Sequence, residues 1–207
     1  MKTQYVTYLS LGSNQGNKLE NLQNAIHLIA DKIGAIQKIS SVYKTPSLGF
    51  EGEHFLNIAM RVSTHLRPET LMKTVLHIEN ELGRKRTQKK EYENRNIDID
   101  ILLFDDEIIF SKDITIPHPR MLDRKFVLVP LAEITENIIH SIEKKQIHKC
   151  LENCTDTSEI TLIDATLKRP IPISEKYNYI AIEGNIGSGK TSFAKMLSDE
   201  FNAKMVL

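Results

Sequence analysis

The chain has 207 residues, 26% of them charged and 41% hydrophobic, a composition typical of a globular protein with one full domain and part of a second. Its 27 Lys and Arg residues balance its 27 Asp and Glu residues, which excludes a net electrostatic field able to attract nucleic acid or an anionic membrane. The N-terminus lacks the apolar core of a signal peptide and no apolar run approaches membrane-spanning length, so we expect a cytoplasmic protein.

Two strand–helix–strand units are predicted in the first half of the chain. Asn17 is placed to cap the first helix and Gly34 to end it, while Pro68 suits the first turn of the second helix and Gly83 its end. This order indicates an α+β fold, the ferredoxin-like β-α-β-β-α-β sandwich, whose antiparallel sheet carries helices on one face and leaves the other free for a substrate. The apolar spacing predicts strands at 5–11, 36–43, 55–63 and 97–104 and helices at 19–33 and 68–82.

The rest of the chain divides into three predicted segments. The first domain, 1–163, is completed by a short strand near 107–110 and a helix around 144–153. A proline-containing linker is expected at 164–176, and a fragment of a second enzyme at 177–207.

The two cysteines, Cys150 and Cys154, lie on one face of a predicted helix. Together with the nearby His148 they fall short of the four ligands that structural zinc requires. We expect both to behave as small hydrophobic residues, without a disulfide in a reducing compartment.

An acidic pair lies in the last predicted strand, in the run NRNIDIDILLF at 94–104. Because side chains alternate along a strand, the isoleucines would share the core face while Asp98 and Asp100 lie side by side on the opposite face. Two adjacent carboxylates repel each other unless a positive charge lies between them. The pair is either a solvated outer face or a site for a hard cation such as Mg²⁺, and by itself it leaves both open.

Two groups of residues near this strand favour a substrate site. Phe55 and Asn57 share one strand face, so an aromatic plate lies beside an amide that can bind the edge of a heterocycle, and Phe126 could supply a second plate. Carboxylates flanked by cations suit a metal-bound polyphosphate. The flanking basic residues are Arg84, Arg86, Arg95, His118 and Arg124.

Seven blocks along the chain form an ordered set: LGSN (11–14), SSVYKTPSLG (40–49), FLNIAM (55–60), IENELGRKR (78–86), RNIDIDILLF (95–104), IPHPRM (116–121) and DRKFVLVPLAEI (123–134). In this order they resemble the 6-hydroxymethyl-7,8-dihydropterin pyrophosphokinase family of folate biosynthesis, over roughly residues 5–160.

The resemblance implies an enzyme that transfers the β,γ-pyrophosphate of ATP to the hydroxymethyl oxygen of a reduced pterin and releases AMP, with two Mg²⁺ ions as cofactors. Asp98 and Asp100 match the pair that holds the ions, and Arg84 and Arg95 match arginines that close over the reaction; Arg84, Arg95 and Asp98 are thus the implied catalytic residues. The implied ATP contacts are Glu79, Arg86, His118 and Arg124. The implied pterin pocket is formed by Thr45, Pro46, Leu48, Phe55, Asn57 and Phe126.

The chain departs from the family pattern in the loop before Arg95. Where family members often have a basic residue followed by Trp, this chain has Glu91 and Tyr92, and Lys89 or Lys90 would supply the missing charge. We expect these differences to alter the closed loop and the affinity for ATP rather than the type of reaction.

A different motif, GNIGSGKT at 184–191, matches the phosphate-loop pattern G-x-x-x-x-G-K-[ST] between an apolar run, YIAIE, expected to be a strand, and an amphipathic stretch. The form IEGNIGSGKT resembles deoxynucleoside kinases. It implies an incomplete P-loop β-α unit, the start of a covalently fused kinase domain. The residues expected to bind phosphate there are Gly184, Gly187, Gly189, Lys190 and Thr191.

Two other functions compete with the pyrophosphokinase. The chain could be a nucleoside kinase that works through its phosphate loop, but the further strands, substrate pocket and lid of such an enzyme are missing from the sequence. The first domain could instead be a ligand-binding module that regulates the kinase. Asp98 and Asp100 with Arg84 and Arg95 favour a transferase, because binding alone requires neither two metal ions nor closing arginines.

Overall fold

The computed structural model describes residues 4–47, 52–84, 94–171, 176–201 and 203–206. The chain divides into a first unit, Met1–Pro170, and a second unit, Ile171–Leu207. The strands are β1 (Tyr5–Ser13), β2 (Gly34–Ile39), β3 (Val42–Thr45), β4 (Phe55–Thr64), β5 (Asp98–Phe104), β6 (Ile109–Phe110), β7 (Thr115–Ile116) and β8 (Thr161–Ile163). The helices are α1 (Lys18–Lys32), α2 (Pro68–Glu81), α3 (Lys125–Ile134), α4 (Ile147–Glu152) and, in the second unit, α6 (Lys190–Phe201).

β4 is the centre of the sheet that the described residues of the first unit form. It pairs antiparallel with β1 on one side and with both β2 and β3 on the other. β5 pairs antiparallel with β1, and β8 with β3, which gives the order β5-β1-β4-β3-β8 with β2 also on β4. The expectation of an antiparallel sheet in a mixed α/β fold is confirmed.

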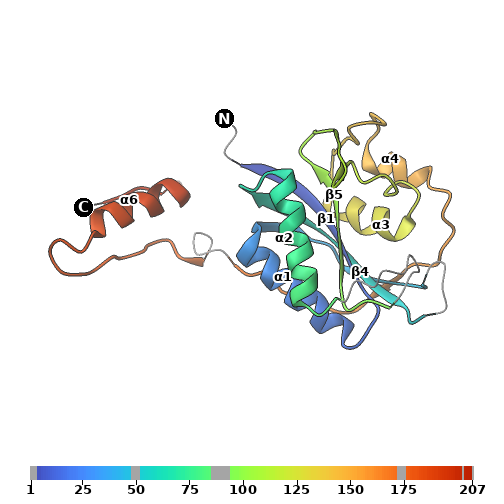
Figure 1. Ribbon diagram of the computed structural model, residues 1–207, viewed down its shortest axis with the longest axis horizontal. Coiled ribbons are helices and arrows are strands. Elements are labelled where there is room, and N and C mark those ends of the chain that lie inside the picture. The colour runs from blue at the N-terminus through green and yellow to red at the C-terminus, as the bar shows by residue number, and fades with distance from the viewer. Residues whose placement is uncertain (1–3, 48–51, 85–93, 172–175, 202, 207) are drawn as a thin grey trace. The chain divides into compact units, whose positions relative to one another are not determined.

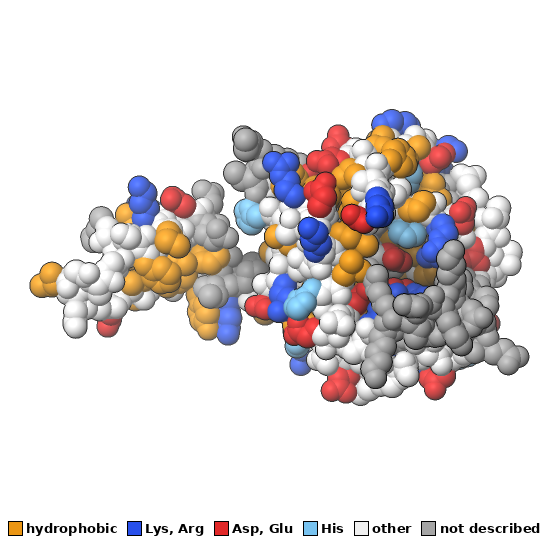
Figure 2. Space-filling view, viewed as in Figure 1, with side chains coloured by type: hydrophobic (Ala, Val, Ile, Leu, Met, Phe, Trp, Pro, Cys, Tyr) orange, Lys and Arg blue, Asp and Glu red, His pale blue; other side chains and the backbone are white. Residues whose placement is uncertain are grey.

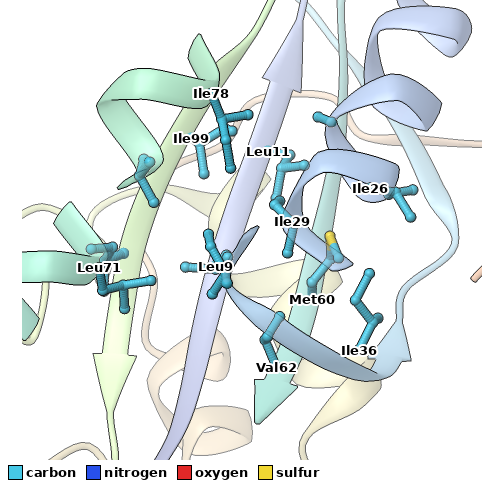
Figure 3. Packing of buried hydrophobic residues seen from close by; sticks show 14 of the residues in the cluster. Leu9, Leu11, Ile26, Ile29, Ile36, Met60, Val62, Leu71, Ile78 and Ile99 are labelled. Atoms are coloured by element: carbon cyan, nitrogen blue, oxygen red, sulfur yellow. The ribbon is translucent and has the colours of Figure 1, made fainter. Parts of the chain in front are cut away.

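α1 and α2 lie together on one side of this sheet (Figure 1). α1 begins after Asn17, as the sequence predicts, because the Asn17 side chain accepts a hydrogen bond from the backbone N–H of Glu20 at 3.3 Å. The apolar stripes of the two helices bury themselves against the sheet, together with the predicted core face of the isoleucines around the acidic pair. Figure 3 shows the packed residues Leu9, Leu11, Ile26, Ile29, Ile36, Met60, Val62, Leu71, Ile78 and Ile99.

Truncation of Leu9, which is fully buried in this cluster, is expected to destabilise the first unit. Leu9→Ala removes methyl groups from a packed site that can collapse only partly, so we expect a loss of about 2–5 kcal/mol in the free energy of unfolding, measured in urea. Leu162→Ala is the matched control, since Leu162 on β8 is 61% exposed. A loss below about 1 kcal/mol for Leu9→Ala would contradict this packing.

The opposite face of the sheet is partly covered by α3 and α4, which corrects the expectation that it is free (Figure 1). Val127 and Leu128 of α3 pack with Tyr8 and Ala59 of the sheet in a second apolar cluster. The sequence pattern does not predict α3, because it is apolar on most sides and contains Pro130, so it lacks the stripe of an amphipathic helix.

The strand expected at 36–43 is two strands, β2 and β3, with a break between them. At the break, the backbone N–H of Ser40 donates to the carbonyl oxygen of Ala59, and Ser40 Oγ accepts from the N–H of Ala59, both at 2.9 Å. A side-chain oxygen thus takes the place of a backbone carbonyl in the ladder, and regular pairing is interrupted there.

The first half of the predicted linker is attached to the first unit. Gln23 on α1 exchanges two hydrogen bonds with the backbone of Lys168, at 2.9 and 2.8 Å, and Arg169 donates to the carbonyl oxygen of Ile36 at 2.9 Å. Ala165 and Leu167 pack against the main core. The predicted domain boundary at 163 therefore precedes the end of this unit, which is Pro170.

In the second unit, the strand expected in the run YIAIE does not form among the described residues, whereas the helix after it does, as α6. A strand requires a neighbouring strand for its backbone hydrogen bonds, and the described part of this unit contains none. Ile186, Phe193 and Met196 are exposed, and Figure 2 shows apolar side chains gathered on the surface of this unit. Neither unit has, in its described residues, a helix with the length and apolar character needed to cross a membrane.

Candidate active site

The centre of the candidate site is Asp98, at the start of β5, which two arginines contact. Arg84 Nη1 lies 2.6 Å from Asp98 Oδ1, and Arg95 Nη1 donates to Asp98 Oδ2. Arg84 immediately follows the C-terminal turn of α2 and Arg95 precedes β5, so two separate segments converge on one carboxylate. The three residues that the family resemblance implies to be catalytic therefore lie together.

The Nη1 atom of Arg84 that contacts Asp98 also contacts Glu79, which is 1% exposed on the last turns of α2. Glu79 Oε1 accepts a hydrogen bond from Arg84 and another, at 2.8 Å, from the backbone N–H of Ile99 on β5. Burying a carboxylate requires such charged and hydrogen-bonded partners. Glu79, an implied ATP contact, thus holds the Arg84 guanidinium group next to the strand that carries the acidic pair.

Asp100 lies next to Asp98 on the same face of β5, near a second group of basic residues. His118 Nε2 is 3.9 Å from Asp100 Oδ1, and Arg124 Nη1 is 4.0 Å from Asp100 Oδ2. Burial raises the pKa of Asp100 and the charge of Asp98 raises it further, while His118, Arg124 and Arg84 oppose the rise. Burial also lowers the pKa of His118, although the negative charge of Asp100 opposes this shift. The lowered pKa favours the neutral imidazole.

The acidic pair is suited to a hard cation that brings other oxygen ligands with it. The side chains of Asp98 and Asp100 are 24% and 35% exposed, so their carboxylates remain accessible. Within the described residues, the pair is not part of a cluster of three or more His, Cys, Asp or Glu side chains able to hold a metal. Two neighbouring carboxylates suit Mg²⁺, which is often held by one or two carboxylates together with substrate phosphates.

The polar side chains of the predicted heterocycle pocket, on β4 and β3, lie on the same face of the sheet as the acidic pair on β5. Asn57 on β4 is 2% exposed and donates from Nδ2 to Thr45 Oγ1 at 2.8 Å, while Phe55 is half-buried beside them. Thr45 pairs with Phe55 in the β3–β4 register, and Pro46 follows Thr45 directly. The Asn57 Oδ1 acceptor faces the position that a side chain on Gly12 would take.

Gly12 links the two halves of the site, although the sequence pattern does not single it out. In the sheet register it lies between Asp98 on β5 and Asn57 on β4. A Cβ atom at Gly12 would be 2.9 Å from Asn57 Oδ1 and 3.5 Å from the Phe55 ring. A glycine inside a strand often marks a close approach of another group, and this signal could have indicated Gly12.

Phe126 and Arg124 enter the site from the N-terminal end of α3. The Arg124 guanidinium carbon lies 5.5 Å from the centre of the Phe126 ring, so Arg124 lies near both Asp100 and an aromatic face. Phe126 itself packs against the α3–α4 cluster as a half-buried residue. The position of α3 therefore determines where the Phe126 ring lies.

Glu133 and Tyr43 fasten α3 to the sheet, and neither is predicted from the sequence. Glu133 accepts hydrogen bonds from Tyr43 Oη at 3.0 Å, Ser41 Oγ at 2.8 Å and the backbone N–H of Ser41 at 3.0 Å. Tyr43 is also the register partner of Asn57. The Glu133 carboxylate thus connects the helix that carries Phe126 with the strands that carry Thr45 and Asn57.

Tyr43→Phe is expected to make the first unit more resistant to alkali. Burial, and then the hydrogen bond to Glu133 and its charge, raise the pKa of Tyr43 to about 12. Because the folded-state pKa exceeds the unfolded value near 10, the unfolded state loses its proton first, and stability falls as the pH rises from about 10 to 12. Unfolding free energies measured between pH 9 and pH 12 should fall less steeply in Tyr43→Phe, and equal slopes would contradict this account.

Several predicted residues lie outside the described part of the chain. They are Leu48 of the implied pterin pocket, Arg86 of the implied ATP contacts, and Lys89, Lys90, Glu91 and Tyr92 of the divergent loop.

The phosphate-loop residues of the second unit form a turn before α6. Gly187 and Gly189 have φ values of +80° and +83°, which favour glycine. Lys190 Nζ donates to the carbonyl oxygens of Gly184 and Asn185, both at 2.6 Å, so the ammonium group lies inside the loop. Thr191 is in the first turn of α6.

Relatives of known name match the first unit. A protein-family model described as 7,8-dihydro-6-hydroxymethylpterin-pyrophosphokinase (HPPK) matches residues 8–136. The 2-amino-4-hydroxy-6-hydroxymethyldihydropteridine pyrophosphokinase of Aquifex aeolicus is 40% identical over 141 residues, which are 68% of this chain and 86% of the relative. The Folic acid synthesis protein FOL1 of Dictyostelium discoideum is 41% identical over 136 residues, which are 65% of this chain and 20% of that protein.

Solved structures match the fold at lower identity. The Plasmodium falciparum HPPK-DHPS triple mutant has a TM-score of 0.62 and 18% sequence identity, over 72% of this chain and 44% of that one. This chain therefore spans less than half the length of that structure, and at such identity the likeness concerns the fold alone. The family match ends at residue 136, before the second unit begins.

Proposed function

The chain belongs to the 7,8-dihydro-6-hydroxymethylpterin-pyrophosphokinase family, and from this premise we propose that it transfers pyrophosphate from ATP to 6-hydroxymethyl-7,8-dihydropterin in folate synthesis. The observation that carries the proposal is the arrangement around Gly12. On one side lies Asp98 with its two arginines and Asp100, and on the other lies the pair of Asn57 and Thr45. A polyphosphate site and a heterocycle site thus share one face of the sheet.

The reaction requires alignment and charge stabilisation more than a strong base. The pterin hydroxymethyl oxygen attacks the β-phosphorus of ATP, the bond from that phosphorus to the AMP oxygen breaks, and the electron pair stays on AMP. Arg84 and Arg95 would bind phosphate oxygens in place of Asp98, and Arg124 and His118 would bind further oxygens. The hydroxyl proton would pass to Asp98 or to water, and Asn57 with Phe55 and Phe126 would orient the ring.

Asp98 and Asp100 are the residues that would hold Mg²⁺, as two ions on the phosphates of ATP. When bound, the ions neutralise phosphate charge and polarise the attacking hydroxyl group. The contacts of Asp98 with Arg84 and Arg95 would then have to be exchanged, since both of its oxygens already accept from guanidinium groups. Glu79 would keep Arg84 in place during that exchange.

Identification of the products tests the proposal. The full chain, incubated with ATP, Mg²⁺ and 6-hydroxymethyl-7,8-dihydropterin, should give two products in phosphorus NMR, AMP and a pterin diphosphate, in equal amounts. AMP should form only in the presence of the pterin. Formation of ADP with a pterin monophosphate would contradict pyrophosphate transfer.

For the second unit we propose a phosphate-binding element of a fused kinase domain, as a separate candidate function. The loop around Lys190 supports it, because the ammonium group donates to two backbone carbonyl oxygens of the loop, and Gly187 and Gly189 have the positive φ values typical of such a loop. Nucleoside kinase activity would additionally need a substrate pocket. Incubation of this chain with ATP and deoxynucleosides should give no nucleoside monophosphate. Lys190→Ala is the control: ADP that forms only with a nucleoside, and only when Lys190 is present, would assign kinase activity to the loop.

Two finer assignments complete the proposal. The β5-β1-β4 order, with β2 and β3 beyond β4 and helices α1 and α2 on one face, supports a ferredoxin-like sandwich with a third layer added by α3 and α4. We also place the protein in the cytoplasm, which rests on the sequence prediction alone.

A further inference from the structure

Asn14, the residue after β1, is a fully buried side chain whose hydrogen bonds reach two distant segments. Its Oδ1 accepts from the backbone N–H of Arg95 at 2.7 Å, and its own backbone N–H donates to the carbonyl oxygen of Arg95 at 3.1 Å. Its Nδ2 donates to Asn94 Oδ1 at 2.7 Å and to the carbonyl oxygen of Glu53 at 3.4 Å. Both ends of the amide are therefore used.

The hydrogen bonds to Arg95 fix the backbone of a residue whose side chain binds phosphate oxygens in the proposed function. Both backbone polar groups of Arg95 are bonded to Asn14, while its guanidinium group donates to Asp98. Asp98 is in turn the register partner of Gly12, two residues before Asn14. The end of β1 thus sets where the Arg95 side chain starts, and β5 sets where it ends.

The bond to Glu53 reaches the other half of the site. Glu53 lies two residues before Phe55, and the same segment is tied to α1, where Lys18 bonds the His54 carbonyl oxygen at 2.8 Å and the Glu53 carboxylate at 2.7 Å. The Asn14 amide is therefore a bridge between the segment that enters the heterocycle side and the segment that carries a phosphate-side arginine.

We infer that Asn14 is a positioning residue that acts through Arg95 and holds the phosphate side of the site in register with the heterocycle side. The effect on rate rests on the proposed function. The two hydrogen bonds of Asn14 with the Arg95 backbone, which we call the anchor, are a property of the folded chain. Displacement of a reacting group by about 1 Å can cost about 100-fold in rate, so loss of this anchor is expected to lower kcat more than it raises the KM for the pterin.

The anchor is tested without catalysis by hydrogen exchange of backbone amides. Asn14→Leu removes both polar ends of the amide at similar side-chain size. In this variant the Arg95 N–H should exchange at least about tenfold faster than in the wild-type chain, while the core amides keep their wild-type exchange rates. Asn14→Asp keeps an acceptor for that N–H and should retain most of the protection. Asn21→Ala is the matched control, because Asn21 bonds Ser13 and Gln15 in the same turn and does not bond Arg95.

The effect on rate is tested by a double-mutant cycle in the full chain. We expect Asn14→Leu to lower kcat about 30- to 100-fold, and to lower it less than about threefold when Arg95 is already alanine. Multiplicative losses in the double variant would overturn the inference, as would unchanged Arg95 exchange in Asn14→Leu. Failure of the wild-type chain to make AMP would instead overturn the proposed function, with the exchange result still deciding whether the anchor exists. If Asn14→Leu does not fold, Asn14→Ala, which also removes both ends of the amide, is measured in its place, and equal losses for Asn14→Ala in the wild-type and Arg95→Ala backgrounds overturn the inference.

Discussion

Replacement of Asp98 by asparagine is expected to lower the rate of pterin-dependent AMP formation by about 10³-fold. The substitution keeps the size of the side chain but removes the charge that Arg84 and Arg95 both contact and that would hold Mg²⁺. Stability should change little, because Arg84 keeps Glu79 as a partner and Asp98 is only half-buried at the start of β5. Thermal unfolding and initial rates of AMP release measure the two effects.

Asp105→Asn, just beyond the other end of β5, is the matched control for that experiment. Asp105 accepts from the backbone N–H of Val6 at 3.0 Å and has a φ of +46°, and asparagine can keep both the acceptor and the backbone conformation. Its activity should stay within about twofold of the wild type. An Asp98→Asn variant as active as Asp105→Asn would contradict the assignment of Asp98.

Arg84→Ala is expected to destabilise the first unit by about 3 kcal/mol, an unusually large effect for a single substitution. Removal of the guanidinium group takes a charged partner away from the carboxylate of Glu79, which is 1% exposed. Most of the loss is the cost of that buried charge rather than the strength of the ion pair itself. Urea unfolding at neutral pH measures it.

The Glu79→Gln variant distinguishes two causes of such a loss: the cost of the buried Glu79 charge, and the loss of the contacts that Arg84 makes with Asp98 or by packing. A neutral amide in place of Glu79 can still accept from the N–H of Ile99, so the double variant of Arg84→Ala and Glu79→Gln should recover more than half of the lost stability. No recovery would indicate that Arg84 stabilises the fold through its contact with Asp98 or by packing. Activity should remain low in both variants, because neither restores the phosphate-side cation.

The strand that carries the acidic pair could be predicted from the sequence because its alternation is strict. Ile99 and Ile101 are in the main core and Asp98 and Asp100 are on the opposite face, as the pattern requires. The helical stripe after Asn17 is equally regular, and α1 forms there. In both cases one side of the element meets the core and the other meets solvent or a site, which is the condition that makes periodicity informative.

The parts that could not be predicted depend on contacts between distant segments. α3 is covered on most sides, so its sequence shows no stripe, and the break at Ser40 depends on a bond to Ala59 across the sheet. The roles of Glu133 and Asn14 are likewise set by partners far away in the sequence. The run YIAIE has the composition of a strand, but a strand forms only where another strand can pair with it.

That Arg84, Arg95 and Asp98 would lie together could be expected from the sequence, whereas the contacts that support them could not. Arg84, Arg95 and Asp98 lie close together in a short stretch of sequence, and charges so near a strand end indicate a site even before their contacts are known. Glu79 could be identified only by resemblance as a residue near ATP, whereas its hydrogen bonds to Arg84 and to the backbone of β5 follow from how α2 packs on the sheet.

The most direct test of the central claim compares two variants of the full chain in one assay of AMP formation from ATP and 6-hydroxymethyl-7,8-dihydropterin. If the first unit carries pyrophosphate transfer, Lys190→Ala in the phosphate loop should form AMP within about twofold of the wild-type rate, while Asp98→Asn should lose nearly all activity. Loss of AMP formation in Lys190→Ala together with retention in Asp98→Asn would contradict the account and assign the chemistry to the second unit.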